Sequence, residues 1–126
     1  MNKVILVGRL ARDPEVKYIG TDKPLCITSY TLAVDRIYKK GEADFIKCKA
    51  FGRAGEFAEK YFKKGLRVSV SGRLETGSYT NRDGQKVYTT EVIVEEQEIA
   101  QSKNEAKDIP GFEGVSEEMQ RELPFV

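Results

Sequence analysis

The chain has 126 residues, of which 40% are hydrophobic and 33% are charged. These values indicate one soluble domain with a buried core, and they exclude a wholly disordered chain. Residues 1–100 carry 18 Lys and Arg against 14 Asp and Glu, whereas residues 101–126 carry 3 against 6. A basic body with an acidic end is compatible with a nucleic-acid surface followed by an interaction tail.

The sequence has no histidine and two cysteines, Cys26 and Cys48. A zinc site with the usual number of ligands is therefore excluded, and we expect no metal, no cofactor and two reduced thiols buried in strands. The apolar run Val4–Val7 is too short for a secretion signal, and no run approaches the length of a membrane span. We therefore expect a cytoplasmic protein without membrane contact.

Asn2–Leu10 predicts a first strand that is apolar on both faces, with Gly8 at a bend or a bulge. Such a strand needs cover on both sides, from this chain or from a second subunit. After a turn at Asp13 and Pro14, Val16–Ile19 is expected to continue the strand. A loop then separates it from the next element.

Leu25–Tyr38 predicts a long second strand, which forms a hairpin with a third strand over Asp44–Gly52. At the strand period of two, one face of the third strand carries Ile46, Cys48 and Ala50, and the other carries Phe45, Lys47, Lys49 and Phe51. The first face can pack a core. The second alternates aromatic rings with ammonium groups, which suits bases stacked beside neutralised phosphates. For this segment alone, an exposed edge strand kept soluble by lysines is the alternative interpretation.

Arg53–Phe62 predicts a helix whose apolar stripe consists of Phe57, Ala58, Tyr61 and Phe62. We assign this stripe to the core and give it no ligand-binding role.

Leu66–Leu74 alternates as a fourth strand, with Leu66, Val68 and Val70 inside and Gly72 at a bulge. The chain continues through Glu75–Tyr79, turns at Asn81–Gly84 and returns as a fifth strand over Val87–Val94. Tyr79 and Tyr88 flank this hairpin.

The periodicity stops at Gln101. We expect residues 1–100 to form one domain and residues 101–126 to form a disordered acidic tail. The tail ends in an apolar segment that suits a pocket on another protein.

This order of elements predicts a mainly all-β fold, a five-stranded Greek-key barrel of the OB type, with one helix between the third and fourth strands. The face of the second and third strands in such barrels binds oligonucleotides or oligosaccharides.

The segments NKVILVGRL-x-x-DPEVKY, TLAVDR, ADFIKCKAFG, SGRLETGSY and DGQKVYTTEV closely resemble the bacterial single-stranded DNA-binding protein family, over roughly residues 1–96. The resemblance implies an OB-fold homotetramer, cytoplasmic and associated with the nucleoid. It also implies binding of single-stranded DNA with little sequence preference during replication, recombination and repair, and a tail that recruits replication and repair proteins. The base-stacking residues it implies are Tyr38, Phe45, Phe51 and Tyr79. Three of these positions are commonly tryptophan in the family.

For the phosphates we expect contacts from seven cations. Two lie between the stacking rings, Lys47 and Lys49, and five lie on or near the loops and the fourth strand, Lys39, Lys40, Arg73, Arg82 and Lys86. Partner enzymes are expected at Leu123, Pro124 and Phe125. Here Val126 follows Phe125, whereas family tails usually end at Phe.

We expect no enzymatic activity, because the acids are scattered and neither cysteine has a histidine partner. Two alternatives stay open, an RNA-binding OB module and an OB-fold adaptor of the primosome.

Overall fold

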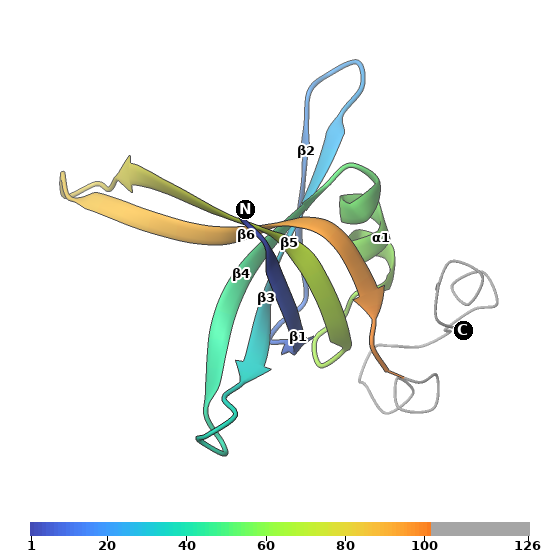
Figure 1. Ribbon diagram of the computed structural model, residues 1–126. Coiled ribbons are helices and arrows are strands. Elements are labelled where there is room, and N and C mark those ends of the chain that lie inside the picture. The colour runs from blue at the N-terminus through green and yellow to red at the C-terminus, as the bar shows by residue number, and fades with distance from the viewer. Residues whose placement is uncertain (102–126) are drawn as a thin grey trace.

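The computed structural model describes residues 1–101, and the predicted tail lies outside this range from residue 102 onward. The elements are β1 (Val4–Leu10), β2 (Glu15–Ile19), β3 (Leu25–Asp35), β4 (Ala43–Phe51), α1 (Arg53–Tyr61), β5 (Arg67–Thr80) and β6 (Lys86–Ile99). Figure 1 shows that the strands curl around a common core, with α1 on the side opposite to the projecting β5–β6 hairpin.

The sheet closes on itself. Its strands follow one another in the order β1-β5-β6-β4-β3-β2, and β1 also pairs with β3 through Arg9 with Ala33 and Leu10 with Leu32. Five strands therefore form a barrel, which β2 extends along the outer part of β3. The predicted mainly-β, five-stranded OB fold with a helix before the fourth barrel strand is confirmed.

A turn separates β1 from β2, at the place where the sequence predicts one. β1 and β2 lie one after the other along β3, but four residues separate Leu10 from Glu15, whereas two residues separate their partners Leu32 and Ser29. The additional residues between β1 and β2 form the turn of residues 11–14. In this turn the backbone N–H of Ala11 donates to the backbone carbonyl oxygen of Thr31 at 2.9 Å. The turn predicted at Asp13 and Pro14, and the strand predicted to follow it over Val16–Ile19, are therefore confirmed.

The core follows the predicted alternation. Leu66, Val68 and Val70 are fully or nearly fully buried, as are Cys48 and Ala50 on β4, while Ile46 packs against them. On the helix, Ala58, Tyr61 and Phe62 are buried and Phe57 packs beside them. The core assignment of all three segments is confirmed.

Hydrogen bonds between partly buried polar groups link α1 to the barrel. The Tyr30 hydroxyl on β3 donates to Oε1 of Gln97 on β6 at 2.8 Å, and Nε2 of Gln97 donates to the Ala54 oxygen at 2.6 Å. The helix begins after Gly52, whose φ of 62° is a conformation that favours glycine. The backbone N–H of Gly52 donates to the Cys26 oxygen at 2.9 Å, so this turn also joins β3.

The two glycines that were expected to bend strands behave differently. The pairing of β5 with β6 shifts register between Ser71 and Gly72, so the predicted bulge is confirmed. The pairing of β1 with β5 runs unbroken from Val4 to Arg9, so the bend predicted at Gly8 was wrong. A Cβ atom on Gly8 would lie 2.6 Å from the Ala33 oxygen, so this glycine permits close approach of β1 to β3.

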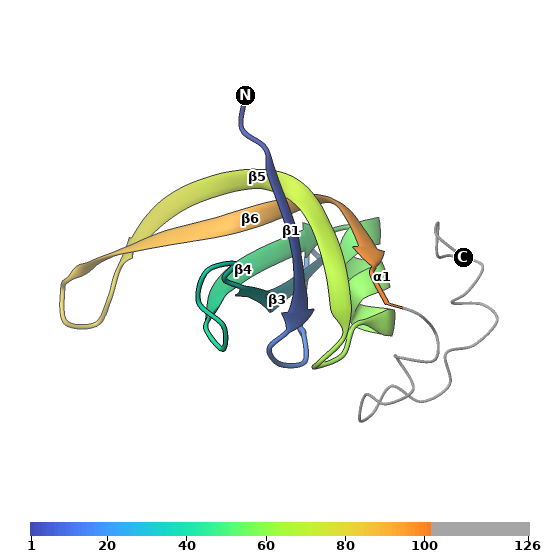
Figure 2. The ribbon, with the colours of Figure 1, turned by 60° about the horizontal axis from the view of Figure 1, so that its bottom comes forward.

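Beyond the bulge, β5 and β6 leave the barrel as a long hairpin, here called the arm (Figures 1 and 2). Its turn is built as predicted: Oδ1 of Asn81 accepts the N–H groups of Asp83 and Gln85, and Gly84 has a φ of 80°. β5 has about the predicted extent, ending at Thr80 where the prediction ended at Tyr79, but β6 is longer than expected and reaches Ile99, where the prediction ended at Val94. Within residues 1–101, no helix is long and apolar enough to cross a membrane.

Candidate nucleic-acid interface

The outer face of β4 shows the alternation of rings and cations that the sequence predicts. The side chain of Phe45 is 68% exposed and that of Phe51 is 38% exposed, and Lys47 between them is also exposed. Their partners across the β3–β4 ladder are short: Ala33 faces Phe45, Thr31 faces Lys47 and Ser29 faces Lys49. Because Ala33 cannot cover the ring of Phe45, that aromatic face stays open for stacking, whereas Phe51 faces the larger Ile27 and is less exposed.

A groove lies between the first half of β4 and the arm. β4 and β6 pair only at Cys48 with Val92 and Lys49 with Ile93, and they diverge beyond these residues. The resulting hollow has a volume of about 630 Å³ and is here called the arm groove. Its lining consists of Phe45, Ile46, Lys47, Leu74, Tyr79, Val87, Tyr88, Thr89, Thr90 and Glu91.

The arm groove brings together two of the predicted stacking residues from distant parts of the chain. Phe45 comes from β4 and Tyr79, which is 57% exposed, comes from the end of β5. Lys47 lies in the same lining, so an ammonium group is within the groove that holds both rings. Open aromatic faces beside a cation are the arrangement that binds single strands in a sequence-tolerant way.

The groove contains a ring that the site prediction did not include. Tyr88 is 74% exposed, and Nζ of Lys86 lies 5.3 Å from its ring centroid. The sequence showed that Tyr88 flanks the hairpin, but only the divergence of β4 and β6 makes it a lining residue. The signal that the sequence offered was Lys86, two residues before Tyr88 on the arm.

The other two predicted stacking residues lie outside the arm groove. Tyr38 is 96% exposed and lies in the β3–β4 loop, because β3 ends at Asp35, earlier than expected. Phe51 lies at the far end of β4, opposite Ile27. The four predicted rings are thus distributed over the β4 face, its loop and the arm.

An ion pair fixes the base of the β3–β4 loop. Nη2 of Arg36 lies 2.7 Å from Oδ1 of Asp44, and Nε of Arg36 donates to the same oxygen at 3.0 Å. This hydrogen-bonded guanidinium lowers the pKa of Asp44 below its usual value. The loop carries Tyr38, Lys39 and Lys40 into solvent from this base.

The predicted phosphate-binding cations fall into two groups. Two already have carboxylate partners: Nζ of Lys49 lies 3.4 Å from a carboxylate oxygen of Glu91, and Nη1 of Arg73 lies 3.0 Å from one of Glu75. The others are Lys39, Lys40, Lys47, Arg82 and Lys86, and within residues 1–101 none of them has a carboxylate within 4 Å. Charge available to a phosphate therefore concentrates in the loop, at Lys47 and at the tip of the arm.

The two cysteines are buried free thiols. Burial raises the pKa of Cys48 to about 12, which keeps it a neutral packing group at physiological pH. Among residues 1–101, no three His, Cys, Asp or Glu side chains gather where they could hold a metal ion.

The chain is similar in sequence to a known protein family and to several of its members. Residues 1–100 match the Single-strand binding protein family. The chain is 47% identical over 104 residues to a single-stranded DNA-binding protein of Clostridium perfringens, covering 82% of this chain and 69% of that protein. It is 40% identical over 131 residues to single-stranded DNA-binding protein 3 of Clostridium acetobutylicum, covering 98% and 90%. With a single-stranded DNA-binding protein of Bacillus cereus the identity is 41%, and the match spans 62% of that longer protein.

Proposed function

The chain belongs to the single-strand binding protein family, and on this premise we propose that its barrel binds single-stranded DNA through the arm groove and the outer face of β4. Bases stack on Phe45 and Tyr79, and Lys47 neutralises a phosphate between them. Tyr38 and Phe51 extend the stacking surface at the two ends of β4. The observation that carries the proposal is the presence of three open rings, those of Phe45, Tyr79 and Tyr88, and one unpaired ammonium group in a single groove.

Binding through stacking requires little sequence preference. Every base offers a flat face, and one stacked base contributes about 1–3 kcal/mol when measured by alanine substitution. The rings here are phenylalanine and tyrosine, since the chain contains no tryptophan. We therefore expect sequence-tolerant binding with a weaker contribution per base than tryptophan would give.

The test compares three substitutions of Phe45. Phe45→Ala removes the ring, Phe45→Leu keeps apolar bulk without an aromatic face, and Phe45→Tyr keeps the face. We expect Phe45→Ala and Phe45→Leu to weaken the binding of labelled oligo-dT by about 1–3 kcal/mol in fluorescence anisotropy, and Phe45→Tyr to retain it. Unchanged affinity for Phe45→Ala combined with Tyr79→Ala would remove the proposal.

DNA, rather than RNA, is the proposed ligand because the relatives are named for single-stranded DNA. Competition between oligo-dT and oligo-U of equal length tests this choice, since discrimination depends on contacts at the 2′ position. Tighter binding of the RNA would favour the alternative of an RNA-binding module.

The proposal extends to roles that depend on more than one barrel. We place the protein in replication, recombination and repair as a non-enzymatic, cytoplasmic factor associated with the nucleoid. Its acidic tail, residues 101–126, would recruit partner enzymes through Leu123, Pro124 and Phe125. Deleting residues 123–126 is then expected to abolish capture of those enzymes from extract while leaving affinity for DNA intact.

We also propose a homotetramer. Ile5 is 73% exposed and Val7 is 52% exposed on the outer face of β1, so the cover that the sequence calls for does not come from residues 1–101 of the same chain. A second copy of the chain would supply it.

A further inference from the structure

A second cavity lies on the other side of Lys47 from the arm. It has a volume of about 330 Å³ and is here called the turn cavity. Its lining consists of Arg12, Asp13, Glu15, Ser29, Tyr30, Thr31, Lys47, Cys48, Lys49 and Glu91. Lys47 and Glu91 line the arm groove as well, so the two hollows adjoin across these residues.

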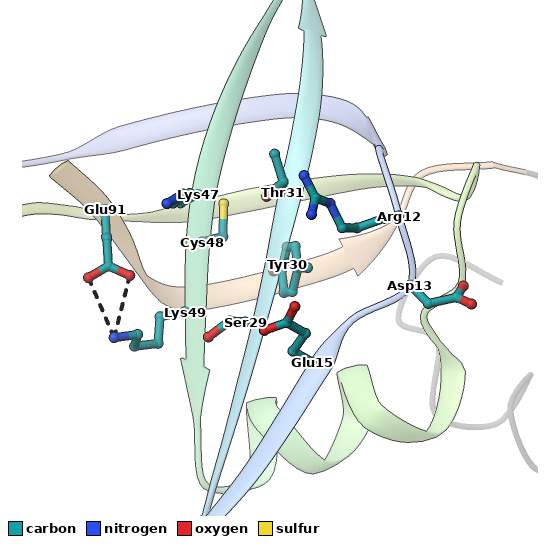
Figure 3. A pocket seen from close by; sticks show the side chains of 10 residues that line it. All are labelled: Arg12, Asp13, Glu15, Ser29, Tyr30, Thr31, Lys47, Cys48, Lys49 and Glu91. Atoms are coloured by element: carbon teal, nitrogen blue, oxygen red, sulfur yellow. Dashed lines mark hydrogen bonds and ion pairs between the residues drawn. The ribbon is translucent and has the colours of Figure 1, made fainter. Parts of the chain in front are cut away.

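Arg12 enters the turn cavity because the turn between β1 and β2 contains two more residues than the stretch of β3 that it spans. The turn is held on both sides. The backbone N–H of Ala11 donates to the backbone carbonyl oxygen of Thr31 at 2.9 Å, and the backbone N–H of Lys64 donates to Oδ1 of Asp13 at 2.8 Å. Figure 3 shows the Arg12 guanidinium beside Thr31, over the outer face of β3.

The acids of the turn cavity do not neutralise Arg12. Glu91 is paired with Lys49, and Asp13 points away from the cavity toward the backbone of Lys64 (Figure 3). Glu15 lies at the other end of the turn cavity, where it is the ladder partner of Ser29. Within residues 1–101, neither Arg12 nor Lys47 has a carboxylate within 4 Å.

Two unpaired cations and a hydroxyl therefore lie along one short stretch of the sheet, with the Arg12 guanidinium beside Thr31 and the Lys47 ammonium on the far side of β4 from Arg12 (Figure 3). Lys47 is the ladder partner of Thr31, and Arg12 lies on the other side of that threonine. A guanidinium presents paired N–H donors that match the oxygens of a phosphodiester, and the threonine hydroxyl can donate a further hydrogen bond. This chemistry fits a backbone phosphate.

We propose that the turn cavity is a second phosphate-binding subsite, in which Arg12 and Lys47 hold the DNA backbone as it leaves the arm groove and crosses β3. The inference rests on the proposed function of the arm groove. It defines a path for the strand, from the arm over Lys47 toward the turn between β1 and β2. Arg12 then contributes to binding of strands long enough to reach the turn and not to binding of shorter ones.

The experiment measures the salt dependence of binding for two lengths of labelled oligo-dT, roughly 4 and 16 nucleotides, which bracket the site sizes of OB folds. For the longer oligomer, Arg12→Gln is expected to reduce the slope of log K against log salt by about 0.7, the value for one phosphate contact on a single strand. For the shorter oligomer, it should leave the slope unchanged. Arg12→Lys keeps the charge and should keep the slope while weakening affinity, because it lacks the paired donors.

Lys23→Gln is the matched control, since it removes one charge from an exposed loop that lines neither hollow. It should leave the slope for both oligomers unchanged, and thermal unfolding should show that all variants fold. An unchanged slope for Arg12→Gln with the longer oligomer, or an equal loss at both lengths, would overturn the proposed path. If Phe45→Ala still weakens binding in that case, the proposed function stands without this subsite. If Phe45→Ala also leaves binding unchanged, the arm groove is not the DNA-binding site.

Discussion

Gly8 shows how a single residue sets the closure of the barrel. A Cβ atom at this position would meet the Ala33 oxygen at 2.6 Å and Cγ2 of Val34 at 3.1 Å. The first contact is with backbone that β3 holds in its ladder, so it cannot be relieved by a rotamer change. We therefore expect Gly8→Ala to lower the free energy of unfolding by about 1–3 kcal/mol, as measured by urea denaturation.

Gly77 on the arm provides the control for this substitution. A Cβ atom there would lie 3.2 Å from Oγ1 of Thr89, a side-chain atom that can rotate away. Gly77→Ala should change stability by much less than Gly8→Ala. Equal losses for the two variants would contradict the role given to Gly8 in the approach of β1 to β3.

At the scale of elements, β1 has one face in the core and one face open. Val4 and Leu6 pack against the core, while Ile5 and Val7 point outward. Over Val4–Gly8 the strand pairs with β5, and its pairing with β3 begins only at Arg9. An apolar face beside an incompletely paired edge is a surface that a second copy can cover.

The prediction for β1 concerns assembly mass. Ile5→Asp combined with Val7→Asp should shift the protein to a smaller species in sedimentation velocity, because a charge in an apolar interface is costly. Ile37→Asp is a suitable control, since Ile37 is 88% exposed in the β3–β4 loop. A mass unchanged by the β1 substitutions would show that this face is not the subunit interface.

The elements could be predicted from the sequence because their signals are local. Alternation identified β4 and the first half of β5, and the helical stripe identified α1. The arm groove could not be predicted, because it depends on where β4 and β6 separate. The same holds for the Lys49–Glu91 pair, which joins residues from different strands, and for Arg12, whose position results from the unequal spacing along β3.

At the scale of the whole molecule, the barrel separates two kinds of surface. The arm and the outer face of β4 expose rings and cations, whereas α1 lies on the opposite side (Figure 1). Tyr18 belongs to that helical side: its hydroxyl donates to Glu59 at 2.8 Å, and this hydrogen bond raises the pKa of Tyr18 above its usual value. Tyr18 is 52% exposed, so it serves as an internal control for any method that detects exposed rings.

The most direct test of the central claim is photochemical cross-linking of the intact chain to oligo-dT that carries 5-iododeoxyuridine, with the modified residues identified by mass spectrometry. Stacking in the arm groove predicts cross-links at Phe45 and Tyr79, and their loss in the presence of excess unlabelled oligo-dT. Cross-links confined to Tyr18 and its surroundings, with none in the arm groove, would contradict the account.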